Sequence, residues 1–148
     1  MTGKDLKTIF DLIAIEYGFK KQRYMYVRDF DDFVLRVSLQ NSLDGDDYCF
    51  YCYFLIKAIH TQSALESFLT ADITGQQCFI TENGNLESIQ LKDFYADDIS
   101  KIIRDSMDSL IKLIENNGVQ SYLKKYPEYI RTIPMRSKEY LKNQGIIE

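Results

Sequence analysis

Hydrophobic residues recur every three or four positions over residues 4–17, which is the spacing of one face of an α-helix. Thr2, with Asp5 three residues later, is a variant of the capping box that begins many helices. Gly18 follows at the position where a left-handed glycine commonly ends a helix. The pattern therefore predicts an amphipathic helix whose apolar side consists of Leu6, Ile9, Phe10, Ile13 and Tyr17.

The pattern then changes to alternation, the period of a β-strand, over residues 24–28, 33–40 and 48–59. Between the last two segments, Asp44-Gly45 is typical of a two-residue hairpin turn. A turn there pairs residues whose numbers add up to 89. The turn residues and the side-chain pattern then agree, because four apolar pairs fall on one face. These pairs are Leu39 with Phe50, Val37 with Cys52, Leu35 with Phe54, and Phe33 with Ile56.

The remaining pattern predicts a short helix or loop over residues 60–73 and a second hairpin around Asn83-Gly84, between residues 78–81 and 86–91. A long helix over residues 95–116 ends at Asn117-Gly118, and a short helix follows over residues 119–126. Ser137 is predicted to cap a last helix that Gly145 ends. The fold expected is a single α+β domain over residues 1–148: an N-terminal helix, an antiparallel sheet of about five strands, then C-terminal helices packed on the sheet.

The charge balance restricts the classes of partner. The net charge is −4, which argues against nucleic-acid binding. Residues 1–118 carry a charge of −7 and residues 119–148 carry +3, so an acidic body able to attract a basic partner is one interpretation. The alternative is an ordinary soluble protein with a basic C-terminal helix. Three cysteines, no secretory signal and no apolar run long enough to cross a membrane predict a cytoplasmic location and no membrane partner.

Candidate catalytic and metal-binding residues are few. Cys49 and Cys52 form a CxxC, but within a strand this spacing places the two sulfurs on opposite faces. His60 is the only histidine, and a structural role at the end of a strand is expected, although a distant nucleophile as its partner stays open. Two groups of aspartates, at residues 29–32 and 44–47, fall on turns at opposite ends of the sheet. The sequence therefore predicts no catalytic residue, metal site or cofactor.

The second face of the sheet is the candidate binding surface. The predicted register places Arg36 opposite Tyr53, Ser38 opposite Tyr51, and Gln40 opposite Cys49. Tyr and Arg are enriched at the energetic centres of interfaces. This face is either open to a partner or covered by the C-terminal helices, with the tyrosine rings buried. The predicted binding residues are Tyr24, Tyr26, Arg36, Ser38, Gln40, Tyr51 and Tyr53.

Two short motifs point to a family. Gly18-Phe19-Lys20-Lys21 follows the first helix, and Leu39-Gln40-Asn41-Ser42 ends the second strand. With the order of helix and strands, they resemble a bacterial family known as domain of unknown function 4304, mainly over residues 6–60. The resemblance implies a compact bacterial domain, and it implies no activity, cofactor or catalytic residue.

Together these features favour a small non-enzymatic bacterial module that binds another protein, for example an immunity-type inhibitor of a toxin. Two alternatives stay open. One is a small-ligand binder or hydrolase-like enzyme with a site near His60, and the other is a structural protein that forms a homodimer or larger homo-oligomer through the tyrosine-rich face.

Overall fold

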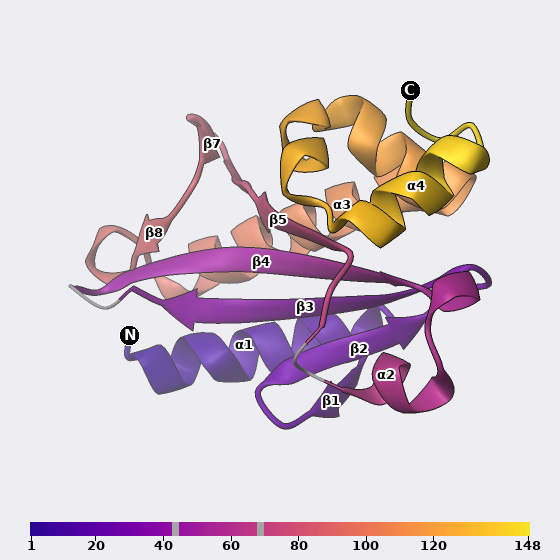
Figure 1. Cartoon of the computed structure of the whole chain (residues 1–148). Helices are drawn as coiled ribbons and strands as arrows, with labels where there is room; N and C mark the ends of the chain where they lie inside the picture. Colours follow the sequence, from indigo (N-terminus) through magenta and orange to yellow (C-terminus); the bar gives the residue numbers. More distant parts are fainter. Residues whose placement is uncertain (43–44, 68–69) are drawn as a thin grey trace.

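A computed structural model describes residues 1–42, 45–67 and 70–148 of the chain (Figure 1). The first half is one helix followed by four strands: α1 (Gly3–Glu16), β1 (Lys20–Gln22), β2 (Met25–Asp29), β3 (Phe33–Asn41) and β4 (Asp47–Ile56). A 3₁₀ turn, η1 (Lys57–Ile59), and the short helix α2 (Gln62–Glu66) lead to β5 (Ile73–Gln77), β6 (Phe79–Thr81), β7 (Gly84–Leu86) and β8 (Ile89–Gln90). The turn η2 (Leu91–Asp93), α3 (Ala96–Lys125), η3 (Pro127–Thr132) and α4 (Met135–Asn143) complete the chain.

The main sheet is antiparallel, in the order β1-β2-β3-β4-β5, and β8 pairs with the first residues of β4 beyond the end of β5. The predicted α+β fold is confirmed. The β3–β4 register is also confirmed along its whole length, from Phe33 opposite Ile56 to Asn41 opposite Tyr48. Asp44 of the predicted turn lies outside the described residues.

Helix α1 begins as the sequence predicts. The Thr2 hydroxyl accepts a hydrogen bond from the Asp5 backbone N–H at 3.2 Å, and the Asp5 carboxylate accepts one from the Thr2 N–H at 2.8 Å. This reciprocal pair is the capping box, which satisfies two amides that the helix itself leaves unpaired. Gly18 follows the helix with a φ of +87°, as expected of a residue that ends a helix.

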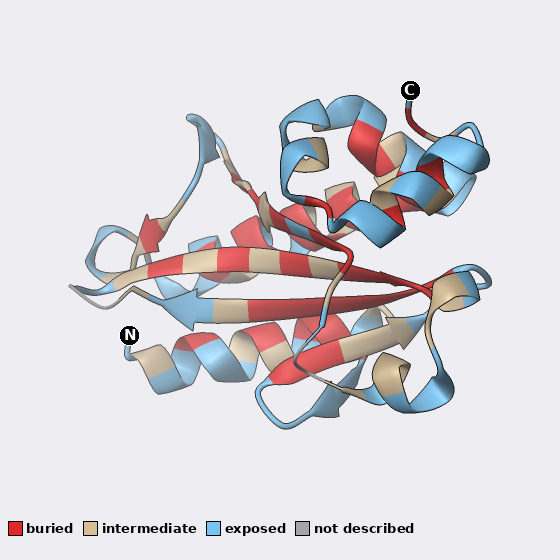
Figure 2. Ribbon diagram, in the orientation of Figure 1, coloured by how far each residue is buried: buried red, intermediate tan, exposed pale blue. Residues whose placement is uncertain are grey.

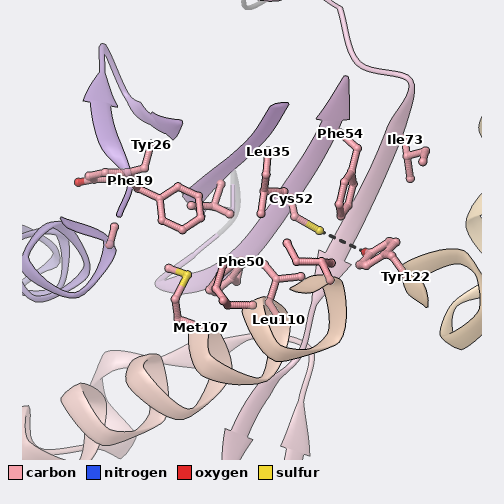
Figure 3. Packing of buried hydrophobic residues seen from close by; sticks show 14 of the residues in the cluster. Phe19, Tyr26, Leu35, Phe50, Cys52, Phe54, Ile73, Met107, Leu110 and Tyr122 are labelled. Atoms are coloured by element: carbon pink, nitrogen blue, oxygen red, sulfur yellow. Dashed lines mark hydrogen bonds between the residues drawn. The ribbon is translucent and has the colours of Figure 1, made fainter. Parts of the chain in front are cut away.

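Helices α1 and α3 cover one face of the sheet, and the core lies between them and the strands (Figure 3). Phe10 of α1 meets Phe50 of β4 edge to face, with ring centroids 5.4 Å apart. Near the end of α3, Tyr122 stacks against Phe54, and its hydroxyl lies 3.2 Å from the Cys52 sulfur. Burial raises the pKa of the Cys52 thiol to about 12. Aromatic packing therefore fixes both long helices to the same side of β4.

Helix α3 is interrupted where the sequence predicts a break. Asn117 and Gly118 have non-helical backbone angles, and Gly118 has a φ of +53°. A Cβ atom at Gly118 would lie 2.8 Å from the Phe33 ring. Glycine is required here for both its left-handed backbone and its small size.

Several parts of the chain differ from prediction, and strands β1 and β5 were not predicted at all. In the second hairpin, Thr81 pairs with Gly84, so the turn is one residue earlier than expected, and the strand predicted over residues 86–91 is divided between β7 and β8. Strand β4 ends at Ile56, three residues early, where η1 begins. Ser137 does not cap α4, because that helix begins at Met135 and the Ser137 hydroxyl is bonded to Asp72.

Candidate functional site

The face of the sheet opposite α1 and α3 carries a row of polar and tyrosine side chains. Along β4 the residues alternate between buried and half-exposed, as the bands in Figure 2 show. The register of β3, β4 and β5 brings the outward-facing residues of the three strands side by side. We call this surface the tyrosine face; it consists of Gln40, Cys49, Tyr51, Tyr53, Thr74 and Gln76.

Hydrogen bonds hold the tyrosine face in one arrangement. The Gln40 side-chain amide donates to the Tyr53 hydroxyl at 2.9 Å and to the Ser38 hydroxyl at 3.1 Å. The rings of Tyr51 and Tyr53 lie with centroids 6.5 Å apart, and both residues are half-exposed. Partial burial, followed by the neighbouring Cys49, raises the pKa of Tyr51. The two rings thus form an aromatic surface that is held in position.

The end of this face where β4 begins is acidic. Burial raises the pKa of the Cys49 thiol, and the nearby Asp47 and Glu87 carboxylates raise it further. The Gln76 side chain donates to the Glu87 backbone carbonyl at 2.9 Å, which holds this segment against the face. A cation approaching the tyrosines from this end meets two carboxylates.

Arg36 lies on this side of the sheet, and of the two alternatives that the sequence left open, an open or a covered face, the structure shows that Arg36 is covered. Only 2% of its surface is accessible, and its guanidinium donates to the carbonyl of Leu65 and, at 3.4 Å, to that of Thr70. Leu65 of α2 and Thr70, just before β5, therefore lie over this part of β3. Burial lowers the pKa of Arg36, although an arginine stays charged. Arg36 therefore holds α2 and the residues just before β5 against this face, and they cover this part of it.

Tyr26 lies on the opposite face from the one predicted. It pairs with Val37, packs against Phe10 with ring centroids 5.3 Å apart, and donates its hydroxyl to Asp11 at 3.1 Å. Its burial, followed by the bond to Asp11, raises its pKa. Tyr24 occupies the turn between β1 and β2, where it is 64% exposed at the edge of the sheet. The turn signal fixed the register of the β3–β4 pair only, so the sequence did not determine which face the side chains of the strand at residues 24–28 occupy.

Ser38 does lie on the predicted face, opposite Tyr51, but it is almost completely buried. Its hydroxyl accepts from Gln40 and so supports the surface from below. Of the predicted binding residues, the structure therefore brings Gln40, Tyr51 and Tyr53 together as accessible groups. Thr74 and Gln76 also belong to the surface, and no local signal in the sequence identified them, because β5 itself was not predicted.

His60 belongs to a buried polar cluster centred on Asp72. The His60 Nε2 atom lies 2.8 Å from the Asp72 carboxylate, and the Ile56 backbone N–H donates to the same carboxylate at 2.7 Å. The Ser137 hydroxyl donates to it at 2.5 Å. Asp72 is only 3% exposed. One carboxylate therefore joins the end of β4, the segment before β5, and α4.

The order of this cluster does not fit nucleophilic catalysis. In a serine–histidine–carboxylate triad the imidazole stands between the hydroxyl and the carboxylate and removes the hydroxyl proton. Here the carboxylate stands between His60 and Ser137. The geometry supports a structural role, as the sequence favours for His60, and offers no support for a hydrolase-like site.

The cysteines lie as their positions in a strand predict. Cys52 faces the core and Cys49 the opposite side, and both are free thiols. Within residues 1–42, 45–67 and 70–148, no three or more His, Cys, Asp or Glu side chains are grouped so that they could hold a metal ion. In the same part of the chain, no helix is long and apolar enough to cross a membrane.

No family model, curated protein or solved structure matches this chain. The resemblance to domain of unknown function 4304 stays a prediction.

Proposed function

We propose that this chain is a non-enzymatic bacterial module that binds another protein through the tyrosine face. The observation that carries the proposal is the pair of half-exposed rings, Tyr51 and Tyr53, held side by side on the sheet face that α1 and α3 leave open. Tyrosines fixed in this way give a large contact area with little loss of side-chain entropy on binding. Amides beside them, from Gln40 and Gln76, supply hydrogen bonds to a partner.

The partner is expected to present a basic surface. Asp47 and Glu87 border one end of the tyrosine face. The faces of tyrosine rings also attract the cationic side chains of arginine and lysine. Residues 1–118 carry a net charge of −7, which accelerates the approach of a positively charged protein. An immunity-type inhibitor that covers a basic toxin surface is the specific form of this function.

The test is affinity capture from the lysate of the source organism, followed by a binding measurement on the purified partner. The Tyr51→Ala, Tyr53→Ala double variant removes both rings, and Tyr95→Ala is the matched control, because Tyr95 is 83% exposed at the start of α3. The wild type and the control should capture the same basic protein. The double variant should bind it at least about a hundredfold more weakly, as expected when two central aromatic residues are removed.

Salt provides a second measure on the same complex. A partner held by complementary charge should associate several times more slowly when ionic strength rises from about 0.05 M to about 0.3 M. Capture of the same partner by the double variant, or of an acidic partner insensitive to salt, contradicts the proposal. Capture of a second copy of this chain would instead assign the face to homodimer formation.

A further inference from the structure

A cavity of about 270 Å³ lies between α1, the β1–β2 turn and the last residues of β3. Phe10 and Tyr26 form its apolar floor, and the exposed ring of Tyr24 forms an outer wall. It adjoins the tyrosine face at Gln40, which lines the cavity, but neither Tyr51 nor Tyr53 lines it. Nothing argued for the protein-binding surface explains why this cavity exists.

Three cationic residues line the cavity: Lys7 from α1, Lys21 from β1, and Arg23 from the turn. A carboxylate lies beside Lys21: Asp11 is 3.7 Å from the Lys21 ammonium and accepts a hydrogen bond from the Tyr26 hydroxyl. Residues 1–118 carry a net charge of −7, so three cations around one hollow form a local field of the opposite sign. A cavity with this field favours an anion.

The backbone at Arg23 supports a functional role for its side chain. Arg23 has a φ of +59°, and it is the one residue other than glycine with a positive φ in the described part of the chain. Gln22 pairs with Met25, so Arg23 and Tyr24 form a two-residue turn, where glycine or asparagine normally occupies a left-handed position. A bulky residue kept in a disfavoured backbone conformation is a feature that clusters at ligand sites. Here that conformation places a guanidinium at the rim of the cavity.

The free edge of β3 adds backbone hydrogen-bond donors. Its pairing with β2 ends at Val37, so no described strand lies beside Leu39 on that edge. The Ser42 N–H donates to the Asp47 carbonyl on the β4 side, and the Phe30 N–H donates to the Phe33 carbonyl on the β2 side. Backbone groups of successive residues in an antiparallel strand point to alternate edges, so the even-numbered residues of β3 face β4 and the odd-numbered ones face the β2 edge. The N–H and C=O of Leu39 therefore point toward this free edge. Leu39 lines the cavity. A ligand there has access to an amide donor as well as to the three cations.

We propose that this cavity binds a small organic anion in which a planar ring carries a phosphate or carboxylate group. The ring lies over Phe10 and Tyr26, and the anionic group is bound by Lys7, Lys21 and Arg23. Charge-assisted hydrogen bonds of this kind are about twice as strong as neutral ones. The proposal does not depend on the function proposed for the tyrosine face.

The test titrates the full-length protein with defined probes and follows backbone amide signals by NMR. The probes are phenyl phosphate and benzoate, with inorganic phosphate and phenol as the separate halves of the ligand. Saturable shifts at Lys21, Arg23 and Leu39 are expected with phenyl phosphate or benzoate, and weaker ones with either half. The stronger of the two probes identifies the anionic group. An absence of saturable shifts with both, at concentrations up to about 10 mM, overturns the proposal, because that limit corresponds to negligible affinity.

A matched pair of variants tests the site. Lys21→Ala should weaken binding of the stronger probe about tenfold, the loss expected for one charge-assisted contact. Lys20→Ala removes the same charge from the neighbouring exposed position of β1, which does not line the cavity, and should change binding less than twofold if contact rather than net charge determines affinity. Equal weakening by the two variants, or none by Lys21→Ala, overturns the assignment. Both residues are exposed, so both variants should fold, and circular dichroism checks that they do.

Discussion

Replacing Asp72 by alanine should destabilise the protein more than almost any other single polar substitution. Its carboxylate accepts hydrogen bonds from the Ile56 N–H at 2.7 Å and the Ser137 hydroxyl at 2.5 Å, and contacts His60 Nε2 at 2.8 Å. Two of these donors are buried with the carboxylate: Ser137 is 3% exposed and Ile56 is 4% exposed. The variant leaves both without an acceptor, whereas the His60 side chain, at 16% exposure, keeps some access to water.

The size of the effect follows from these two donors. Leaving one buried polar group without its partner costs about 1–3 kcal/mol. Removing the carboxylate should therefore lower the free energy of unfolding by about 3–5 kcal/mol, out of the roughly 5–15 kcal/mol typical of a domain. The Ser137→Ala variant removes one of the donors together with its demand for an acceptor, and should cost only about 1–2 kcal/mol.

Urea unfolding followed by circular dichroism measures these changes. Asp31→Ala is the control, because Asp31 is exposed in the turn between β2 and β3, and it should change stability by less than about 0.5 kcal/mol. The double variant of Asp72 and Ser137 should be more stable than the sum of the single effects predicts, by about 1 kcal/mol or more. A loss below about 1 kcal/mol for Asp72→Ala, or strict additivity with Ser137→Ala, would refute the account of this cluster.

Three further substitutions test other parts of the fold. Gly118→Ala should cost about 2 kcal/mol or more in urea unfolding, since it places a Cβ 2.8 Å from the Phe33 ring at a φ of +53°; an unchanged midpoint would contradict the close approach. Arg23→Gly should raise stability by about 1 kcal/mol, measured as a higher Tm, because it relieves the positive φ; a lower Tm would show that the side chain stabilises the turn. The raised pKa of Cys52 keeps its proton on the folded protein above pH 9, where the unfolded thiol ionises. The contribution of Cys52 to the free energy of unfolding should therefore be constant below pH 9 and fall by about 1.4 kcal/mol per pH unit between pH 9 and about 12. In unfolding curves measured between pH 8 and 11, Cys52→Ala should reduce this slope. An unchanged slope would refute the raised pKa of Cys52.

Local signals predicted the β3–β4 hairpin because its register is determined within a few residues. The turn dipeptide and the period of the side chains each specify the same pairing of Leu35 with Phe54. Side chains alternate between the two faces of a strand, so Tyr51 and Tyr53, two residues apart in β4, lie on the same face. The accessible centre of the candidate site was therefore predictable from the sequence.

Strand β5 was not predictable in the same way, because its stability comes from distant contacts. Its sequence, Ile-Thr-Gly-Gln-Gln, has a glycine at its centre and little apolar alternation. Gly75 is needed there because the Tyr122 side chain of α3 occupies the space where a Cβ would be. The Tyr129 hydroxyl of η3 bonds both the N–H and the C=O of Gln76 at the free edge of the strand. Each of these partners is more than forty residues away.

The burial of Arg36 was unpredictable for a related reason. Its position on the strand indicates which face it occupies, but alternation does not reveal what covers that face. The carbonyls that bind its guanidinium come from Leu65, in the short helix α2, and from Thr70, just before β5, and neither has a local pattern that indicates this contact. The sequence left open whether the C-terminal helices cover this face, and at Arg36 the structure places Leu65 of α2 and Thr70 over it.

The most direct test of the central claim is site-specific photo-crosslinking in the source organism. A photoreactive amino acid at Thr74 lies on the exposed part of the tyrosine face, and the same group at Thr8 is equally exposed on α1, across the sheet. If the tyrosine face binds a basic protein, that protein should crosslink from position 74 and not from position 8, and the crosslink should be lost when Tyr51 and Tyr53 are replaced by alanine. A crosslink to the same protein from position 8 but not from position 74 would contradict this claim.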